Sequence, residues 1–225
     1  MTPSPRAILF DFDGIILDTE WPIYESYVSL YREHGHELTL ETYVQCIGSD
    51  FQSWSPETHL ESLTGRVFDW PTINHERNVW IREQLATQYS PFPGIEAALA
   101  VVRRMAKRTA VVSSSTHPWV DGWLEHHGLT GHFERTICRG DAPRIKPAPD
   151  LFLEAANQLE VDPADCLVIE DSANGMRAAH DAGKTVWAIP NRITAVSDFS
   201  AAARILPSAE HLPKAFEDLD PVPEV

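Results

Sequence analysis

The sequence predicts an α/β fold, in which a doubly wound, Rossmann-like parallel sheet carries an inserted α-helical domain. Short apolar runs rich in β-branched residues recur along the chain, and segments with helical spacing separate them. One long stretch without such runs follows the first of them. Continuous rather than alternating apolar runs are typical of strands buried on both faces of a parallel sheet. Strands that alternate with helices indicate a doubly wound fold.

Four apolar runs are predicted to be strands of this sheet. The first stands near the N-terminus and the other three begin only at residue 110, so a long insertion separates them. The predicted strands are residues 7–10, 110–112, 166–169 and 186–189.

Helical spacing fills the intervals between these strands. Ile95, Leu99 and Val102 would share one face of a helix that follows Gly94. Residues 146–160 show the same spacing, with prolines at the entry, where a helix tolerates them. We therefore expect helices at both places, packed on the sheet.

The stretch between residues 19 and 90 departs from this alternation. It has helical spacing, rich in tryptophan and tyrosine, and it contains no lysine. We interpret residues 19–90 as a helical cap domain, inserted into an α/β core domain formed by residues 1–18 and 91–225. The last residues, 216–225, are predicted to be a loose acidic end.

Charge and cysteine content narrow the classes of partner. The 225 residues include 33 Asp and Glu against 18 Lys and Arg, for a formal net charge of −15. Such a chain repels polyanions, so we expect no nucleic acid and no anionic membrane as partner. No apolar run reaches the length of a membrane span, and three widely spaced cysteines fit a reducing compartment. We expect a cytoplasmic protein, either a monomer or a weak homo-oligomer.

Charged and hydroxyl residues follow three of the predicted strands, and one lysine stands before a predicted helix. In open α/β sheets, ligands bind beyond the carboxyl ends of the strands, so these side chains are candidates for one site. Carboxylates suit a hard cation, while hydroxyl and ammonium groups suit phosphate oxygens. In chain order the candidates are Asp11, Asp13, Ser113, Ser114, Lys146, Glu170 and Asp171.

Each candidate alone has an ordinary structural explanation. An Asp-x-Asp pair is often a solvated strand end, and a serine run often forms a turn or caps a helix. The sequence Glu170-Asp171-Ser172 could cap a helix that begins near Ala173. All of these elements in this order, each at a strand end or helix entrance, favour a functional site instead.

Four motifs make the chain similar to the haloacid dehalogenase superfamily of hydrolases, in the branch with a helical cap. It resembles the phosphatase and β-phosphoglucomutase-like members, and the resemblance covers essentially the whole chain. The motifs are "DFDG" at 11–14, "VVSSS" at 111–115, "KPAPDLF" at 146–152 and "IEDSANG" at 169–175.

The resemblance implies a role for each candidate. Asp11 would be the nucleophile that forms an aspartyl-phosphate, and Asp13 the general acid and base. Ser113, Ser114 and Lys146 would bind the phosphoryl oxygens of a small phosphorylated metabolite. Mg²⁺ would be held by Asp11, the main-chain carbonyl of Asp13, Asp171, and Glu170 directly or through water.

Departures from the family pattern separate its branches. Dehalogenases lack the second aspartate, so Asp13 argues against them. Phosphonatases use a cap lysine, whereas no lysine precedes Lys107 here. β-Phosphoglucomutases carry a histidine where Ile23 stands. They also carry a basic pair around a cap glycine, which we align with Gly48, and the neighbours of Gly48 are not basic. Gly48 is the candidate substrate-binding residue of the cap. These differences favour a phosphatase over a phosphomutase; a non-catalytic phosphate-sensing protein is a further alternative.

Overall fold

The computed structural model describes residues 4–47 and 54–219, so Gly48 lies outside the described residues. Six parallel strands form one sheet in the order β3-β2-β1-β4-β5-β6. The strands are β1 (Ala7–Phe10), β2 (Arg108–Val112), β3 (Arg135–Ile137), β4 (Cys166–Glu170), β5 (Thr185–Ala188) and β6 (Arg204–Ile205).

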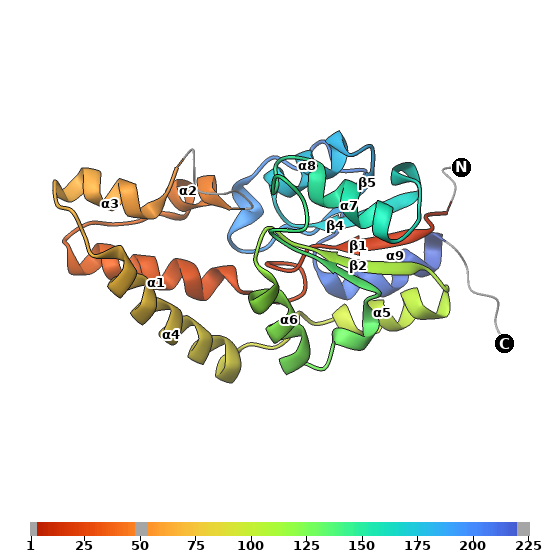
Figure 1. The fold of residues 1–225 in the computed structure, drawn as a ribbon, viewed down its shortest axis with the longest axis horizontal. Coiled ribbons are helices and arrows are strands. Elements are labelled where there is room, and N and C mark those ends of the chain that lie inside the picture. Colours follow the sequence, from red (N-terminus) through yellow and green to blue (C-terminus); the bar gives the residue numbers. More distant parts are fainter. Residues whose placement is uncertain (1–3, 48–53, 220–225) are drawn as a thin grey trace.

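Helices cover both faces of this sheet, as Figure 1 shows. Successive side chains of a strand point to opposite faces, so Ile8 and Phe10 enter one core while Ala7 and Leu9 enter the other. The first core includes residues of α5 (Ile95–Arg104), α6 (His117–His126) and α9 (Leu212–Leu219). The second includes residues of α7 (Asp150–Gln158) and α8 (Ala173–Asp181). The predicted doubly wound arrangement is thereby confirmed.

Four helices follow β1 directly in the chain. They are α1 (Glu20–Glu33), α2 (Leu40–Tyr43), α3 (Pro56–Thr64) and α4 (Trp70–Gln88), and Figure 1 shows them at one end of the molecule. Side-chain caps from Ser55 and Asp69 start α3 and α4, each with a proline in its first turn. Tyr27, Tyr31 and Tyr43 belong to an apolar cluster formed mostly by this segment, which Ile193 of the core joins. The exact division between core and cap, at residues 18/19 and 90/91, stays a prediction.

The predicted elements differ from the structure at three places. All four predicted strands are present, but β3 and β6 were not predicted. Both are short edge strands, and β6 is exposed throughout, so neither has the continuous apolar run by which a buried strand is found. The predicted loose end is also wrong in its first part, because Phe216 is fully buried on α9 against Phe10 and Trp187.

The strand register places the candidate site at one edge of the sheet. Phe10 is opposite Val111 of β2 and Ile169 of β4, so Asp11, Val112 and Glu170 come next on three adjacent strands. Within residues 4–47 and 54–219, no helix is both long enough and apolar enough to cross a membrane.

Candidate active site

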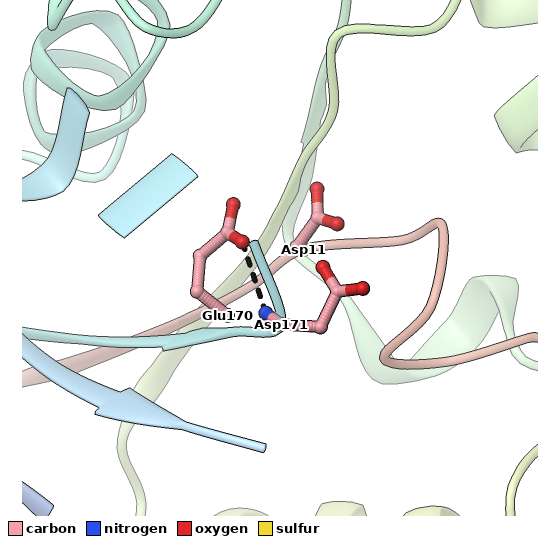
Figure 2. A group of neighbouring side chains, drawn as sticks. All are labelled: Asp11, Glu170 and Asp171. Atoms are coloured by element: carbon pink, nitrogen blue, oxygen red, sulfur yellow. Dashed lines mark hydrogen bonds between the residues drawn. The ribbon is translucent and has the colours of Figure 1, made fainter. Parts of the chain in front are cut away.

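Three buried carboxylates meet at the ends of the two central strands. Asp11 follows β1, Glu170 is the last residue of β4, and Asp171 comes next. One carboxylate oxygen of each lies within 4.8 Å of the others, and Figure 2 shows the three side chains converging. All three residues are at least nine-tenths buried. The structure thus brings together three of the residues predicted from separate motifs.

Lys146 lies against two of these carboxylates. Its Nζ donates to Oδ1 of Asp11 at 2.5 Å, to Oε1 of Glu170 at 2.7 Å and to the carbonyl of Val112 at 2.8 Å. The lysine is only 2% exposed, so both ion pairs are formed away from bulk water. A buried ammonium with three acceptors is fixed in position, which suits a group that must hold a phosphoryl oxygen.

Glu170 is the most fully satisfied of the three carboxylates. Its Oε2 accepts hydrogen bonds from the backbone N–H groups of Asp171 and Ser172 and from the Ser172 hydroxyl. Its other oxygen accepts from Lys146. A Cβ atom at Gly175 would collide with this carboxylate, so only glycine fits there without displacing it. Glu170 therefore positions Lys146, and has less free oxygen to offer a metal than Asp11 and Asp171 have.

Burial and the neighbouring charges shift the pKa values of three groups at this site. Burial raises the pKa of Asp11 to about 8, against the opposing effect of Lys146. Burial, Glu20 and Glu170 raise the pKa of Asp171 well above its usual value. Burial lowers the pKa of Lys146, but Asp11 and Glu170 outweigh this and raise it overall. A bound cation would balance the charge of these carboxylates.

The donor set at this place fits a hard divalent cation. Asp11 and Asp171 supply carboxylate oxygens, the ligands that Mg²⁺ and Ca²⁺ prefer. Asn191 orients Asp171 by donating from Nδ2 to its Oδ2 at 2.6 Å. Gly14 has φ of +86°, and a Cβ there would meet Asp171 and Asn191, so glycine is required by both the backbone and the space.

Asp13 sits beside this group within a ring of hydrogen-bond donors. Its Oδ1 accepts from Thr19 Oγ1 at 2.6 Å and from the indole Nε1 of Trp119 at 2.9 Å. Its Oδ2 accepts from the hydroxyls of Ser113 and Ser115, at 3.1 and 2.8 Å. Four donors from three segments of the chain hold the carboxylate in one orientation.

Ser113 and Ser114 differ in what their hydroxyls face. Ser113 is fully buried and its hydroxyl bonds to Asp13, so the structure assigns it a contact that the sequence did not predict. Ser114 lines the cavity, and its hydroxyl has no hydrogen-bond partner among the described residues. Phosphoryl binding by either serine stays a prediction, and Ser114 has the free donor.

A cavity of about 440 Å³ connects this site to the helical segment. The lining from the helical segment includes a polar cluster: Asn74 Nδ2 donates to Oε1 of Glu57 at 2.7 Å, and Arg77 stacks on the ring of Tyr27, 3.3 Å from its centroid. Ile23 also lines this cavity. The cavity is therefore lined by the catalytic candidates of the core and by a hydrogen-bonded polar cluster of the helical segment.

A further carboxyl group of this cavity is that of Glu20. It is the first residue of α1, 9% exposed, and its Oε2 is buried without a hydrogen-bond partner among the described residues. Burial and the neighbouring Asp13, Asp11 and Glu170 raise its pKa well above the usual value. It lines the cavity together with Asp11 and Asp13.

Glu20, Trp119 and Asn191 are site residues that the sequence patterns do not predict. Asn191 follows β5, so the same rule about strand ends could have identified it. Glu20 and Trp119 stand on helices, and their direction into the site depends on how α1 and α6 pack. No local spacing signals that.

Comparison with known proteins agrees with this geometry. The chain matches the family model described as haloacid dehalogenase-like hydrolase over residues 8–189. It is 37% identical to "Putative phosphatase YhcW" of Bacillus subtilis, over 84% of this chain and 85% of that protein. It is 27% identical to fructose-1-phosphate phosphatase YqaB of Escherichia coli, over 79% and 92% of the two chains.

A solved structure is similar over the full length. The crystal structure of a HAD family hydrolase from Deinococcus radiodurans, with bound phosphate and sodium, superposes with a TM-score of 0.79. It is 27% identical, and the match covers 100% of each chain. The whole architecture, helical segment included, is therefore shared with that protein.

Proposed function

The chain belongs to the haloacid dehalogenase-like hydrolases, and from this premise we propose that it is a phosphatase that hydrolyses a small phosphomonoester. The observation that carries the proposal is the arrangement around Asp11. A buried carboxylate is held by an ammonium group at one oxygen and faces a cavity, with a second aspartate two residues away. The names of the relatives as phosphatases support the same reading.

Asp11 is the nucleophile in this proposal. One of its carboxylate oxygens attacks phosphorus, the bond from phosphorus to the ester oxygen breaks, and an aspartyl-phosphate forms. Lys146 bonds to Oδ1 of Asp11, which fixes the carboxylate and leaves its other oxygen for attack. Lys146, with the hydroxyls of Ser113 and Ser114, then binds the phosphoryl oxygens.

Asp13 moves the protons. It gives a proton to the leaving oxygen as the ester bond breaks, and it later takes one from the water that hydrolyses the aspartyl-phosphate. Phosphate leaves, and both aspartates return to their starting state. The four donors around its carboxylate keep Asp13 close to the cavity that receives the leaving group.

We propose that the metal is Mg²⁺, held by Asp11, the Asp13 carbonyl and Asp171, with Glu170 in support. When bound, it supplies positive charge that offsets repulsion between the Asp11 carboxylate and the substrate dianion. The acidic cluster and its raised pKa values support a cation there.

Hydrolysis is favoured over a phosphomutase reaction by the residue at position 23. Ile23 lines the cavity, and an aliphatic side chain can neither exchange protons nor bind sugar hydroxyls. The substrate is then a small phosphorylated metabolite, with no nucleic acid or membrane involved. A cytoplasmic location, and a monomer or weak homo-oligomer, complete the proposal.

The test is phosphate release from a panel of small phosphate esters, with Mg²⁺ or with a chelator, for the wild type and Asp11→Asn. We expect metal-dependent release that falls more than about a thousandfold in Asp11→Asn. Asp218→Asn, the same change at an exposed position of α9, is the control and should match the wild type. Full activity in Asp11→Asn would contradict the assignment of Asp11 as the nucleophile. Conversion of β-glucose 1-phosphate to glucose 6-phosphate, without net release, would identify a mutase.

A further inference from the structure

Residues 191–193 belong to the loop that follows β5, and they contact both the metal site and the helical segment. Asn191 donates from Nδ2 to Oδ2 of Asp171 at 2.6 Å. Ile193 is 1% exposed and belongs to the apolar cluster of the helical segment. Arg192 stands between these two residues in the chain. The loop therefore joins a carboxylate of the metal site to the helices that follow β1.

Arg192 lies beside the chain on both sides of these helices. Its Nε and Nη2 donate to Oδ2 of Asp18 at 3.1 and 2.6 Å, and its guanidinium carbon lies 3.9 Å from the ring centroid of Trp21 on α1. The other oxygen of Asp18 accepts from the backbone N–H of Trp21. Burial raises the pKa of Tyr89, which follows α4, and the neighbouring Arg192 opposes this effect. One guanidinium group is thus placed where the chain enters the helical segment and where it leaves.

The contacts of Arg192 exceed those of an ordinary surface ion pair. An exposed pair contributes little, because solvent screens it. Here the carboxylate partner is sheltered, since the side chain of Asp18 is only 14% exposed. The guanidinium group is also stacked on the Trp21 indole, which adds a cation–π contact and restricts its orientation.

The side chain of Asn191 depends on the backbone on the far side of Arg192. Its Oδ1 accepts hydrogen bonds from the backbone N–H groups of Ile193 and Thr194, at 2.9 and 3.1 Å. A shift of the backbone at Arg192 would therefore turn the Asn191 amide, whose Nδ2 is the donor that orients Asp171. Residues of this kind, which hold a metal ligand in place, affect metal affinity without touching the ion.

We propose that Arg192 is a positioning residue of the metal site. By holding the loop against Asp18 and Trp21, it fixes Asn191 and, through Asn191, the Asp171 carboxylate. The packing of the helical segment and the orientation of a metal ligand are thereby coupled through one side chain. The inference rests on the metal site of the proposed function, and it assigns a role in that site to a residue that no sequence motif includes.

The first experiment measures Mg²⁺ binding to the substrate-free protein by isothermal titration calorimetry. We expect the dissociation constant to rise about three- to tenfold in Arg192→Gln, and less in Arg192→Lys, which keeps a cation for Asp18. Loss of a positive charge would by itself tighten the binding of a cation, so weaker binding separates positioning from a charge effect. Arg204→Gln is the matched control, because Arg204 is exposed on β6 with its guanidinium carbon 5.1 Å from the ring centroid of Trp187.

The outcomes of this titration separate the inference from the proposed function. A constant that is unchanged or lower in Arg192→Gln would overturn the inference alone. A wild type that binds no Mg²⁺ would overturn the metal assignment together with the inference. Phosphate release should agree: the loss in Arg192→Gln should be restored to within about twofold of the wild type by saturating Mg²⁺, because no ligand atom is removed. A loss that saturating Mg²⁺ does not restore would contradict action through Asp171.

The second experiment tests the link from Arg192 to Asn191 in the absence of metal. The backbone N–H groups of Ile193 and Thr194 are bonded to Oδ1 of Asn191, so their hydrogen-exchange rates, measured by NMR in a chelator, report the orientation of that side chain. We expect both rates to rise at least about threefold in Arg192→Gln and to stay at the wild-type values in Arg204→Gln. Unchanged rates in Arg192→Gln would overturn the link, even if the melting temperature fell.

Discussion

The indole N–H of Trp119 donates a hydrogen bond to Oδ1 of Asp13, 2.9 Å away. The two residues are 106 positions apart, and α6 brings them together by presenting Trp119 from its first turn. Arg82 of α4 lies over the ring of Trp119, with its guanidinium carbon 5.3 Å from the ring centroid. The side chain that the proposal makes the general acid and base is thus oriented by a helix that no catalytic motif includes.

Trp119→Phe removes this hydrogen bond and keeps an aromatic ring. We expect kcat to fall about three- to tenfold, because one of four donors that orient Asp13 is lost. Trp123→Phe is a matched control on the same helix, since the Trp123 indole N–H is buried without a partner among the described residues. Steady-state kinetics of both variants would test this, and equal kcat values would argue against an orienting role for Trp119.

Lys146→Met should strongly destabilise the metal-free protein. It would leave Asp11 and Glu170 facing each other without their shared ammonium group, and breaking a buried ion pair costs about 3–5 kcal/mol. Urea unfolding in the presence of a chelator measures this. Lys184→Met is the control, because Lys184 is also buried but burial lowers its pKa, so losing its charge should cost little. A loss for Lys146→Met no larger than that of the control would contradict the expected coupling.

Stability of the metal-free protein should fall as the pH rises from about 4 to about 8. The pKa of Asp11 is about 8 in the folded protein and 3.8 without the fold, so over this interval the folded state holds a proton that the unfolded state releases. Melting temperature measured in a chelator across this range, for wild type and Asp171→Asn, tests the sign. Asp171→Asn should flatten the decline, because it removes another buried carboxyl group whose pKa is raised.

Added Mg²⁺ should reverse that decline. Protons and the cation compete for the same carboxylates, so the rise in melting temperature on adding Mg²⁺ should be larger near pH 8 than near pH 6. Asp171→Asn should lose most of this rise. A Mg²⁺ effect that is independent of pH and of residue 171 would place the cation elsewhere.

Gly175→Ala should displace the Glu170 carboxylate. The added Cβ would occupy the space of the Glu170 carboxylate, which would have to move away from Lys146. We expect a loss of at least about 2 kcal/mol in the free energy of unfolding and at least tenfold in kcat/KM. Gly122→Ala on α6, where a Cβ meets only open space, should instead raise stability by about 0.5–1 kcal/mol. Similar effects of the two changes would show that the Glu170 position is not critical.

Much of the candidate site could be predicted because strand ends are a local property of the sequence. Apolar runs end at Asp11, Ser113 and Glu170, and parallel strands bring their carboxyl ends to one edge of a sheet. Lys146 was found from its motif, and the structure places it on Asp11 and Glu170. The edge strands β3 and β6 are not predicted, because too few of their residues are buried to give a continuous apolar run.

The doubly wound core, the helical insertion after the first strand and the order of the acidic, hydroxyl and lysine residues along the chain can all be inferred from the sequence alone. The tertiary structure is needed to see that Trp119 and two serines hold Asp13, that Asn191 orients Asp171, and that Glu20 lines the cavity with its Oε2 unpaired among the described residues. Periodicity fixes which face of a helix is apolar. It does not fix the angle at which α1 or α6 packs on the core, and that angle decides which polar side chain reaches the site.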